Sequence, residues 1–151
     1  MAKYQSTIKD FEFYYLLELT RQKTKPLSRW EKPVDEKTLR WIRRQGFFAD
    51  IIPRKTFSGN SVYETVFSKS GRFVSLYHNK FKNTLIRHDA AEQKLEGFLF
   101  GYPGCCVQNF IKHPYHENLL AKADQEILFH WACKSCRVTP QLLPYYKEAK
   151  K

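Results

Sequence analysis

Residues 47–80, FFADIIPRKTFSGNSVYETVFSKSGRFVSLYHNK, decide the fold class, because here the sequence takes on the composition of β-strands. Val, Ile, Tyr, Phe and Thr dominate three short runs, at residues 47–53, 61–67 and 72–78. The connectors between these runs contain glycine, which suits hairpins. The segment therefore predicts a three-stranded antiparallel β meander over residues 47–80.

Helical patterns are expected before this segment. Residues 10–21 predict one helix, and residues 23–33, which contain two prolines, predict a polar connector. A second helix is expected to begin at Asp35, a capping residue, and to end at Gly46. The part comprising residues 1–46 is thus predicted to be helical.

The residues after the meander return to helical spacing. Asp89 and Glu92 have the spacing of a capping box, and the turn GYPG at residues 101–104 must end the helix that they begin. Further helices are expected from Pro103 or Gly104, over residues 113–131, and from Thr139 with Pro140 in its first turn. Residues 86–151 therefore form a helical part that also carries every cysteine of the chain.

Together these patterns predict an α+β fold in a single domain over residues 1–151. A small antiparallel sheet lies in the middle of the chain, with helices before it and mainly after it. An isolated small sheet needs a helix on one face, and the flanking segments can supply one.

The composition is that of a folded protein outside the membrane. Of 151 residues, 42% are hydrophobic and 16% aromatic, which is ample material for a core. No apolar run approaches the roughly 20 residues that span a bilayer, and the first residues lack a signal-peptide pattern. We therefore expect a cytoplasmic protein with no membrane partner, in which cysteines are more often metal ligands or reactive thiols than disulfides.

The net charge of +11 permits contact with a polyanion such as nucleic acid. Divided into residues 1–50, 51–100 and 101–151, the charge is +4, +4 and +3, which indicates an even spread. Residues 75–88, SLYHNKFKNTLIRH, interleave basic and aromatic residues as single-stranded nucleic-acid binders do. A solvated strand edge and loop is the simpler interpretation of that segment, and no known reader motif accompanies it.

The four cysteines form two close pairs. Cys105 and Cys106 are adjacent, and after 26 residues Cys133 and Cys136 form a CxxC pair. Two residues between thiolates let both sulfurs turn onto one ion, and soft thiolates select zinc or iron–sulfur clusters. The spacing predicts one metal site, with zinc as the first choice and an iron–sulfur cluster, or no cofactor, as alternatives.

The ligand set stays open at this point. Neighbouring side chains on a helix point about 100° apart, so a site that uses both adjacent thiols is expected to be strained. One thiol of that pair with Cys133, Cys136 and a histidine is equally compatible. His130 is the favoured histidine, with His113 and His116 as further candidates, although His130 also fits a hydrogen-bonded position in the core.

Two other interpretations of the cysteines remain. Cys105 falls in the first turn of a helix, where the helix dipole lowers a thiol pKa, so it is a candidate nucleophile of a thiol-dependent enzyme. All four could instead be structural thiols or form disulfides. The sequence does not decide whether the protein is an enzyme.

The strings GFLFGYPGCCVQNF (97–110) and HWACKSCRVTP (130–140) resemble a family of uncharacterised proteins, domain of unknown function 483. The resemblance covers about residues 86–146 and implies one cysteine site without an assigned activity. The cysteine pattern also partly resembles the module of heterodisulfide-reductase-like proteins, which would imply an iron–sulfur cluster. That module has a further upstream cysteine, and no cysteine precedes Cys105 here.

The sequence as a whole predicts a small metal-binding protein, with zinc held by Cys105, Cys106, Cys133 and Cys136. The alternatives are a basic nucleic-acid-binding module in which the cysteine cluster is structural, and a thiol enzyme.

Overall fold

The computed structural model describes residues 10–151, which divide into two compact units. Unit 1 is Met1–Arg87, described from residue 10, and unit 2 is His88–Lys151. The described residues hold seven helices and a three-stranded antiparallel sheet in the middle of the chain, so the predicted α+β class is confirmed. The division falls close to residue 86, where the Cys-bearing part was predicted to begin; a single domain stays a prediction.

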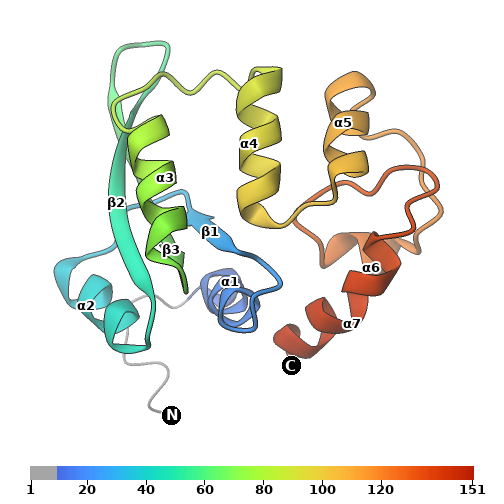
Figure 1. Ribbon diagram of the computed structural model, residues 1–151, viewed down its shortest axis with the longest axis horizontal. Helices are drawn as coiled ribbons and strands as arrows, with labels where there is room; N and C mark the ends of the chain where they lie inside the picture. Colours follow the sequence, from blue (N-terminus) through green and yellow to red (C-terminus); the bar gives the residue numbers. More distant parts are fainter. Residues whose placement is uncertain (1–9) are drawn as a thin grey trace. The chain divides into compact units, whose positions relative to one another are not determined.

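Unit 1 contains the sheet and three helices (Figure 1). Its elements are α1 (Phe11–Arg21), β1 (Leu27–Trp30), α2 (Glu36–Arg44), β2 (Phe48–Lys55), β3 (Ser61–Ser68) and α3 (Gly71–Phe81). The strand order is β1-β3-β2, with β3 antiparallel to both neighbours. The two helices predicted before the sheet and the hairpin of β2 and β3 are confirmed.

The predicted meander is wrong in its third strand. Residues 72–78 lie in α3, because Val74, Tyr77 and Phe81 recur at helical spacing and are all buried on one side of that helix. The third strand is instead β1, which lies within the predicted connector 23–33 and in the part predicted to be wholly helical. The sheet therefore closes by a long-range pairing of β1 with β3.

Helices α1 and α3 cover opposite faces of the sheet. On one face, the Phe13 ring of α1 packs edge-on against Trp30 and Phe67, with centroids 5.5 and 5.9 Å away. On the other face, the Tyr77 hydroxyl of α3 donates a hydrogen bond to the Glu64 carboxylate. Because side chains alternate along a strand, Glu64 and Phe67 of β3 point to opposite sides. Unit 1 thus has three layers, with apolar cores on both faces of the sheet.

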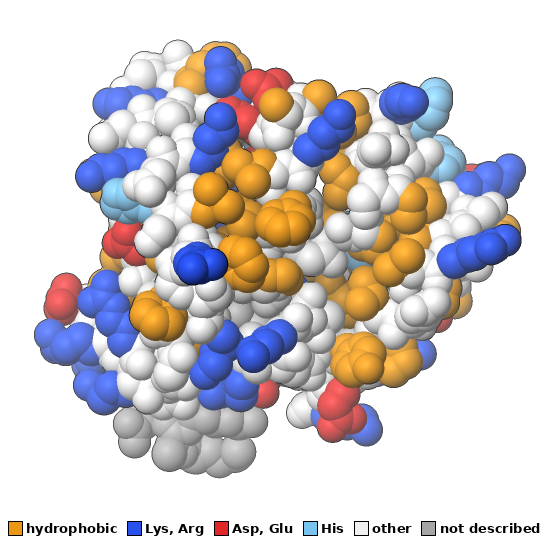
Figure 2. Space-filling view, viewed as in Figure 1, with side chains coloured by type: hydrophobic (Ala, Val, Ile, Leu, Met, Phe, Trp, Pro, Cys, Tyr) orange, Lys and Arg blue, Asp and Glu red, His pale blue; other side chains and the backbone are white. Residues whose placement is uncertain are grey.

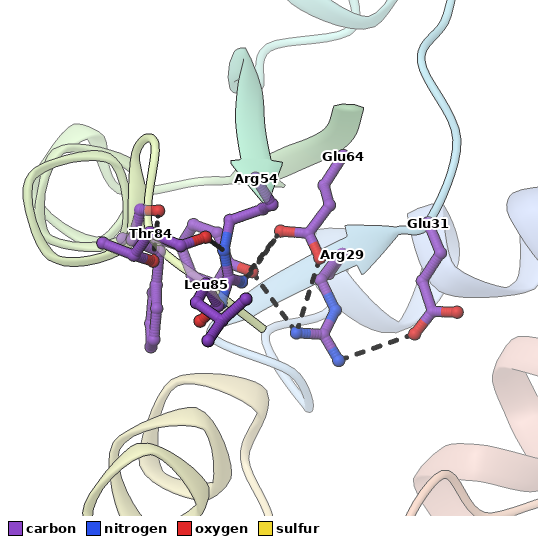
Figure 3. Close-up of polar contacts among 8 residues, drawn as sticks. Arg29, Glu31, Arg54, Glu64, Thr84 and Leu85 are labelled. Carbon is purple, nitrogen blue, oxygen red and sulfur yellow. Dashed lines mark hydrogen bonds and ion pairs between the residues drawn. The ribbon is translucent and has the colours of Figure 1, made fainter. Parts of the chain in front are cut away.

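A buried ionic network joins all three strands to α3 (Figure 3). The Arg54 side chain is 1% exposed, and its guanidinium lies 3.4 Å from the Glu64 carboxylate. The Tyr77 hydroxyl reaches the same carboxylate at 2.5 Å, and burial raises the pKa of Tyr77, which keeps its proton in place. Arg29 adds an ion pair at 3.9 Å, and the carbonyls of residues 84–85 accept from Arg54. Removing one partner would leave buried charge unpaired, which costs far more than a surface pair.

Unit 2 is helical and has no strand in its described residues. It contains α4 (Ala90–Phe100), α5 (Gly104–Lys112), α6 (Lys122–Glu126) and α7 (Thr139–Lys150), and α4 packs beside α5 (Figure 1). The helix predicted over residues 113–131 is wrong, because only the five residues of α6 are helical. Within residues 10–151, the longest helix has 12 residues, and none is long and apolar enough to cross a bilayer.

Candidate metal centre

The turn before Cys105 is a tight corner between α4 and α5. Gly101 ends α4 in the left-handed conformation, with φ of 79°, which glycine adopts without strain. Pro103 precedes the first residue of α5, and its carbonyl accepts from the amide of Cys106 at 3.0 Å. The predicted stop and restart at GYPG is confirmed, and it places both adjacent cysteines in the first turn of α5.

The close approach of α4 to α5 depends on a glycine inside α4. A Cβ added to Gly97 would lie 2.4 Å from Cγ2 of Val107 on α5, a distance that no side chain tolerates. Sequence reasoning missed this position, because a glycine in a helical pattern signals a weak helix before it signals a contact. Gly97 and Val107 therefore fix where α5 presents its cysteines.

Cys133 and Cys136 lie in the loop between α6 and α7. The amide of Cys136 donates to the carbonyl of Cys133 at 3.3 Å, which makes a compact turn. Two further backbone amides point at sulfur atoms: that of Cys133 at Cys106 Sγ, 3.4 Å away, and that of Thr139 at Cys136 Sγ, 3.3 Å away. Donation of this kind favours the charged thiolate that a metal requires.

The four sulfur atoms converge within unit 2. Cys136 Sγ lies 3.4 Å from Cys106 Sγ and 3.7 Å from Cys105 Sγ, and the adjacent pair is 4.0 Å apart. All four sulfurs lie within 4.8 Å of one another. A tetrahedral ion with zinc–sulfur bonds of about 2.3 Å spaces its ligands roughly 3.8 Å apart. The cluster therefore has the dimensions of one four-thiolate site, and all four predicted cysteines belong to it.

The expected strain at the adjacent pair is absent. Cys105 and Cys106 are both helical, and neither has a positive φ. Consecutive Cα atoms are only about 3.8 Å apart, so ordinary side-chain rotamers bring the two sulfurs together although the Cα–Cβ bonds diverge. The prediction considered side-chain direction alone and ignored this short separation.

The cysteines are free thiols, and their exposure varies. Cys106 is buried, with 1% of its surface exposed, while Cys105 is exposed and Cys133 and Cys136 are half-buried. A buried apolar thiol accounts for Cys106 on its own. It does not account for three further sulfurs brought to the same place from the surface.

Three of the thiols differ in acidity. Burial raises the pKa of Cys106 far above its usual range, and burial also raises the pKa of Cys133 to about 11. Burial acts on Cys136 in the same direction, but hydrogen bonds with the hydroxyl and amide of Thr139 outweigh it and lower its pKa to about 7. A thiolate therefore forms at Cys136 near neutral pH, a residue that sequence reasoning did not single out for acidity.

His130 lies outside the sulfur cluster. Among the described residues, the side chains close enough to share this ion are the four cysteines. His130 is buried, and its Nε2 lies 3.0 Å from the hydroxyl of Thr139. That hydroxyl in turn lies 3.1 Å from Cys136 Sγ and 3.6 Å from Cys106 Sγ. This is the hydrogen-bonded core histidine that the sequence left open, and it contacts the cluster through Thr139.

His113 and His116 also lie outside the cluster and organise the connector after α5. The His116 ring lies 3.1 Å from the carbonyl of His113 and contacts the side-chain amide of Asn109. The indole of Trp131 donates to the carbonyl of His116 at 2.7 Å. These contacts hold the connector against the loop that leads to Cys133.

Two amide side chains brace the same loop and were not identified from the sequence. Gln125 donates to the carbonyl of His130 at 2.7 Å, and its Oε1 accepts from the amide of Ala132 at 3.2 Å. Asn118 donates to the carbonyl of Ala132 at 3.0 Å. These bonds replace the backbone bonds that the predicted longer helix would have made. They also set the position of the CxxC turn.

No protein-family model, curated protein or solved structure matches this chain. The resemblance to domain of unknown function 483 stays a prediction.

Proposed function

We propose that unit 2 binds one zinc ion through the thiolates of Cys105, Cys106, Cys133 and Cys136. The observation that supports this proposal is the convergence of four sulfurs within 4.8 Å, from two segments far apart in the sequence. Free thiols gathered in this way, without disulfides, fit a reducing compartment such as the cytosol. The ion joins the α4–α5 corner to the loop before α7.

A single ion fits these distances better than an iron–sulfur cluster. The sulfurs of one coordination sphere lie at most about 4.6 Å apart, twice the metal–sulfur bond. The measured separations of 3.4, 3.7 and 4.0 Å fall within this limit. In a cubane cluster each thiolate binds a different iron, which spreads the four sulfurs over a larger volume.

The role of the ion in this proposal is structural. Four protein thiolates complete a tetrahedral sphere and leave no position for a substrate. The thiol-enzyme alternative finds less support, because Cys105 lies among three other sulfurs, and metal binding would consume it. The nucleic-acid alternative does not involve the cysteines, and its support lies in unit 1.

Metal analysis of freshly purified protein tests the proposal. We expect one zinc per chain, no visible colour, and, after replacement by Co²⁺, the intense absorption of a tetrahedral thiolate complex. A Cys106→Ser variant is expected to lose this absorption, whereas Gln108→Ser, at an exposed position of the same helix, keeps it. A coloured protein that contains iron and sulfide would replace zinc with a cluster. Protein that contains no metal and binds none would contradict the proposal.

A further inference from the structure

The boundary between the units redistributes the charge of the chain. Residues 1–87 hold 18 Lys and Arg against 8 Asp and Glu, a net charge of +10, whereas residues 88–151 hold 8 against 7, a net charge of +1. The even spread that the sequence indicated is thus wrong, because division into thirds cut across both units. Nearly all attraction for a polyanion belongs to unit 1.

Within unit 1, basic side chains gather where α2 leads into β2, and we call this group the basic corner. It consists of Arg21, Arg43, Arg44, Lys69 and Arg72. Lys69 Nζ and the Arg21 guanidinium each lie 5.2 Å from the centre of the Phe47 ring, and Lys69 also donates to the carbonyl of Gly46. Figure 2 shows Lys and Arg side chains gathered over α2, at the lower left.

The basic corner has little acidic compensation. Arg21 pairs with Glu18 at 3.4 Å, but the other four members form no ion pair with any described residue. The nearest acidic group in the adjoining groove is Asp50, whose carboxylate lies 2.7 Å from Nδ1 of His78. Like charges held close together repel one another, and a bound anion would relieve that repulsion.

An open groove of about 1040 Å³ adjoins the basic corner, between β2 and the exposed side of α3. Arg43 and Arg72 line it, together with the side chains of Ser75 and Asn79. Phe48 also lines it and is 56% exposed, and its ring lies 3.3 Å from the position of a Cβ on Gly71. One side of this ring is therefore supported while the rest faces the groove.

We propose that the basic corner and this groove bind single-stranded nucleic acid, with the phosphates on the basic corner and a base stacked on Phe48. Cationic grooves with exposed aromatic rings are the general device for holding single strands, because every base has a face that stacks. A paired base has no free face, so the exposed ring favours a single strand over a duplex.

The groove partly explains the basic and aromatic segment at residues 75–88. Ser75 and Asn79 of that segment line the groove, but its rings at Tyr77 and Phe81 are buried against the sheet. Phe48, outside the segment, supplies the exposed ring. The inference is independent of the zinc site, because every residue that it uses belongs to unit 1.

The test uses the full chain and fluorescently labelled oligo-dT and oligo-U, with affinity measured by anisotropy at several salt concentrations. We expect both strands to bind with strong salt dependence. The triple variant R43Q/R44Q/R72Q is expected to lose at least tenfold in affinity, with a log–log salt slope reduced by about 2. Phe48→Ala is expected to lose roughly 5- to 150-fold without a change in slope.

Matched controls separate a site from general charge attraction. K94Q/K112Q/K122Q removes the same charge from exposed positions of unit 2, and Phe57→Ala removes a ring that is 81% exposed elsewhere in unit 1. Both controls are expected to bind within twofold of the parent, and zinc content and thermal midpoint confirm that every variant is folded. Three results would overturn the inference: no binding by the parent, equal losses in the unit 2 control, or unchanged affinity in Phe48→Ala with equal binding of a duplex.

Discussion

The two units bury apolar side chains to very different extents. Of 25 buried hydrophobic side chains among the described residues, 19 lie in unit 1, over 78 described residues, and six lie in unit 2, over 64. One of those six is Cys106, a member of the sulfur cluster. Unit 2 therefore has about a third of the core of unit 1 with a similar length of chain.

This difference indicates how each unit is stabilised. A core in a chain of fewer than about 70–80 residues rarely supplies more than 3–5 kcal/mol, and small natural domains add disulfides or a metal ion. Unit 1 fills both faces of its sheet and carries the positive charge. Unit 2 has few buried apolar groups, and its loops are joined where the four sulfurs meet. We conclude that a core stabilises unit 1 and that a metal ion stabilises unit 2.

The largest effect is expected from Cys106→Ser. This change removes one thiolate and leaves a hydroxyl at a position that is 1% exposed, so zinc is lost and unit 2 loses its central contact. Hydrogen exchange measured by mass spectrometry is expected to accelerate throughout residues 104–143 and to stay slow in the strands of unit 1. Full zinc content together with unchanged exchange in unit 2 would show that the ion does not stabilise it.

In unit 1, Phe67→Ala is expected to cost about 3–5 kcal/mol, because it opens a cavity among packed rings in a fully buried position. Zinc content should be unchanged, since Phe67 lies in the other unit. Denaturant unfolding followed by tryptophan fluorescence measures the cost, in a Trp131→Phe background that restricts the signal to Trp30 and Trp41. The control Phe57→Ala, at an exposed position, should change stability by less than about 0.5 kcal/mol.

Thr139→Val is expected to weaken zinc binding by about 10- to 100-fold, the usual cost of losing a group that orients metal ligands. The substitution preserves shape but removes the hydroxyl beside the sulfurs of Cys136 and Cys106. Competition with a chelator of known affinity measures the change. Thr139→Ser keeps the hydroxyl and serves as the control; equal losses in both variants would assign the effect to packing.

The smallest effect concerns Lys25 in unit 1. Burial, and secondly the positive charge of Arg29, lower the pKa of Lys25 from 10.5 to about 7. Between these values the unfolded chain holds a proton that the folded chain has released, so the stability of unit 1 should rise with pH. We expect a rise of about 2 kcal/mol from pH 7 to pH 9 that is missing in Lys25→Met.

The same fluorescence assay at pH 7, 8 and 9 compares Lys25→Met with the control Lys37→Met, which changes an exposed lysine. The control should keep the pH dependence of the parent. Parallel curves for the parent and Lys25→Met would show that this lysine keeps its proton in the folded state.

Local signals in the sequence were sufficient to predict several helix ends. The carboxylates of Asp35 and Asp89 accept from the amides of Thr38 and Glu92 at 2.7 and 2.9 Å, as their capping patterns predicted. Gly101 likewise ends α4 as expected. Such features depend on residues within four positions of one another, which a sequence displays directly.

Elements that depend on distant partners were missed. The four residues of β1 become a strand only by pairing with Thr65–Ser68, far along the chain. In residues 72–78, β-rich composition masked a helical spacing that becomes evident only when the sheet covers one side of α3. Tertiary contacts decided both cases, because intrinsic propensities are weak by comparison.

The candidate site shows the same division. The spacing of the cysteines predicted all four members of the cluster, since two close pairs rarely arise without a common purpose. The parts that orient them were not predictable: Thr139 was expected only as a helix cap, and Gly97 matters because Val107 lies against it. Their roles come from contacts across the fold and have no signature in the local sequence.

The most direct test of the central claim is hydrogen exchange of the full chain before and after zinc is removed with a chelator. We predict that residues 88–151 lose protection when zinc is removed and regain it on addition of one equivalent. Residues 10–87 should remain protected throughout. Protection of residues 88–151 that persists in fully zinc-free protein would contradict the claim that the ion stabilises unit 2.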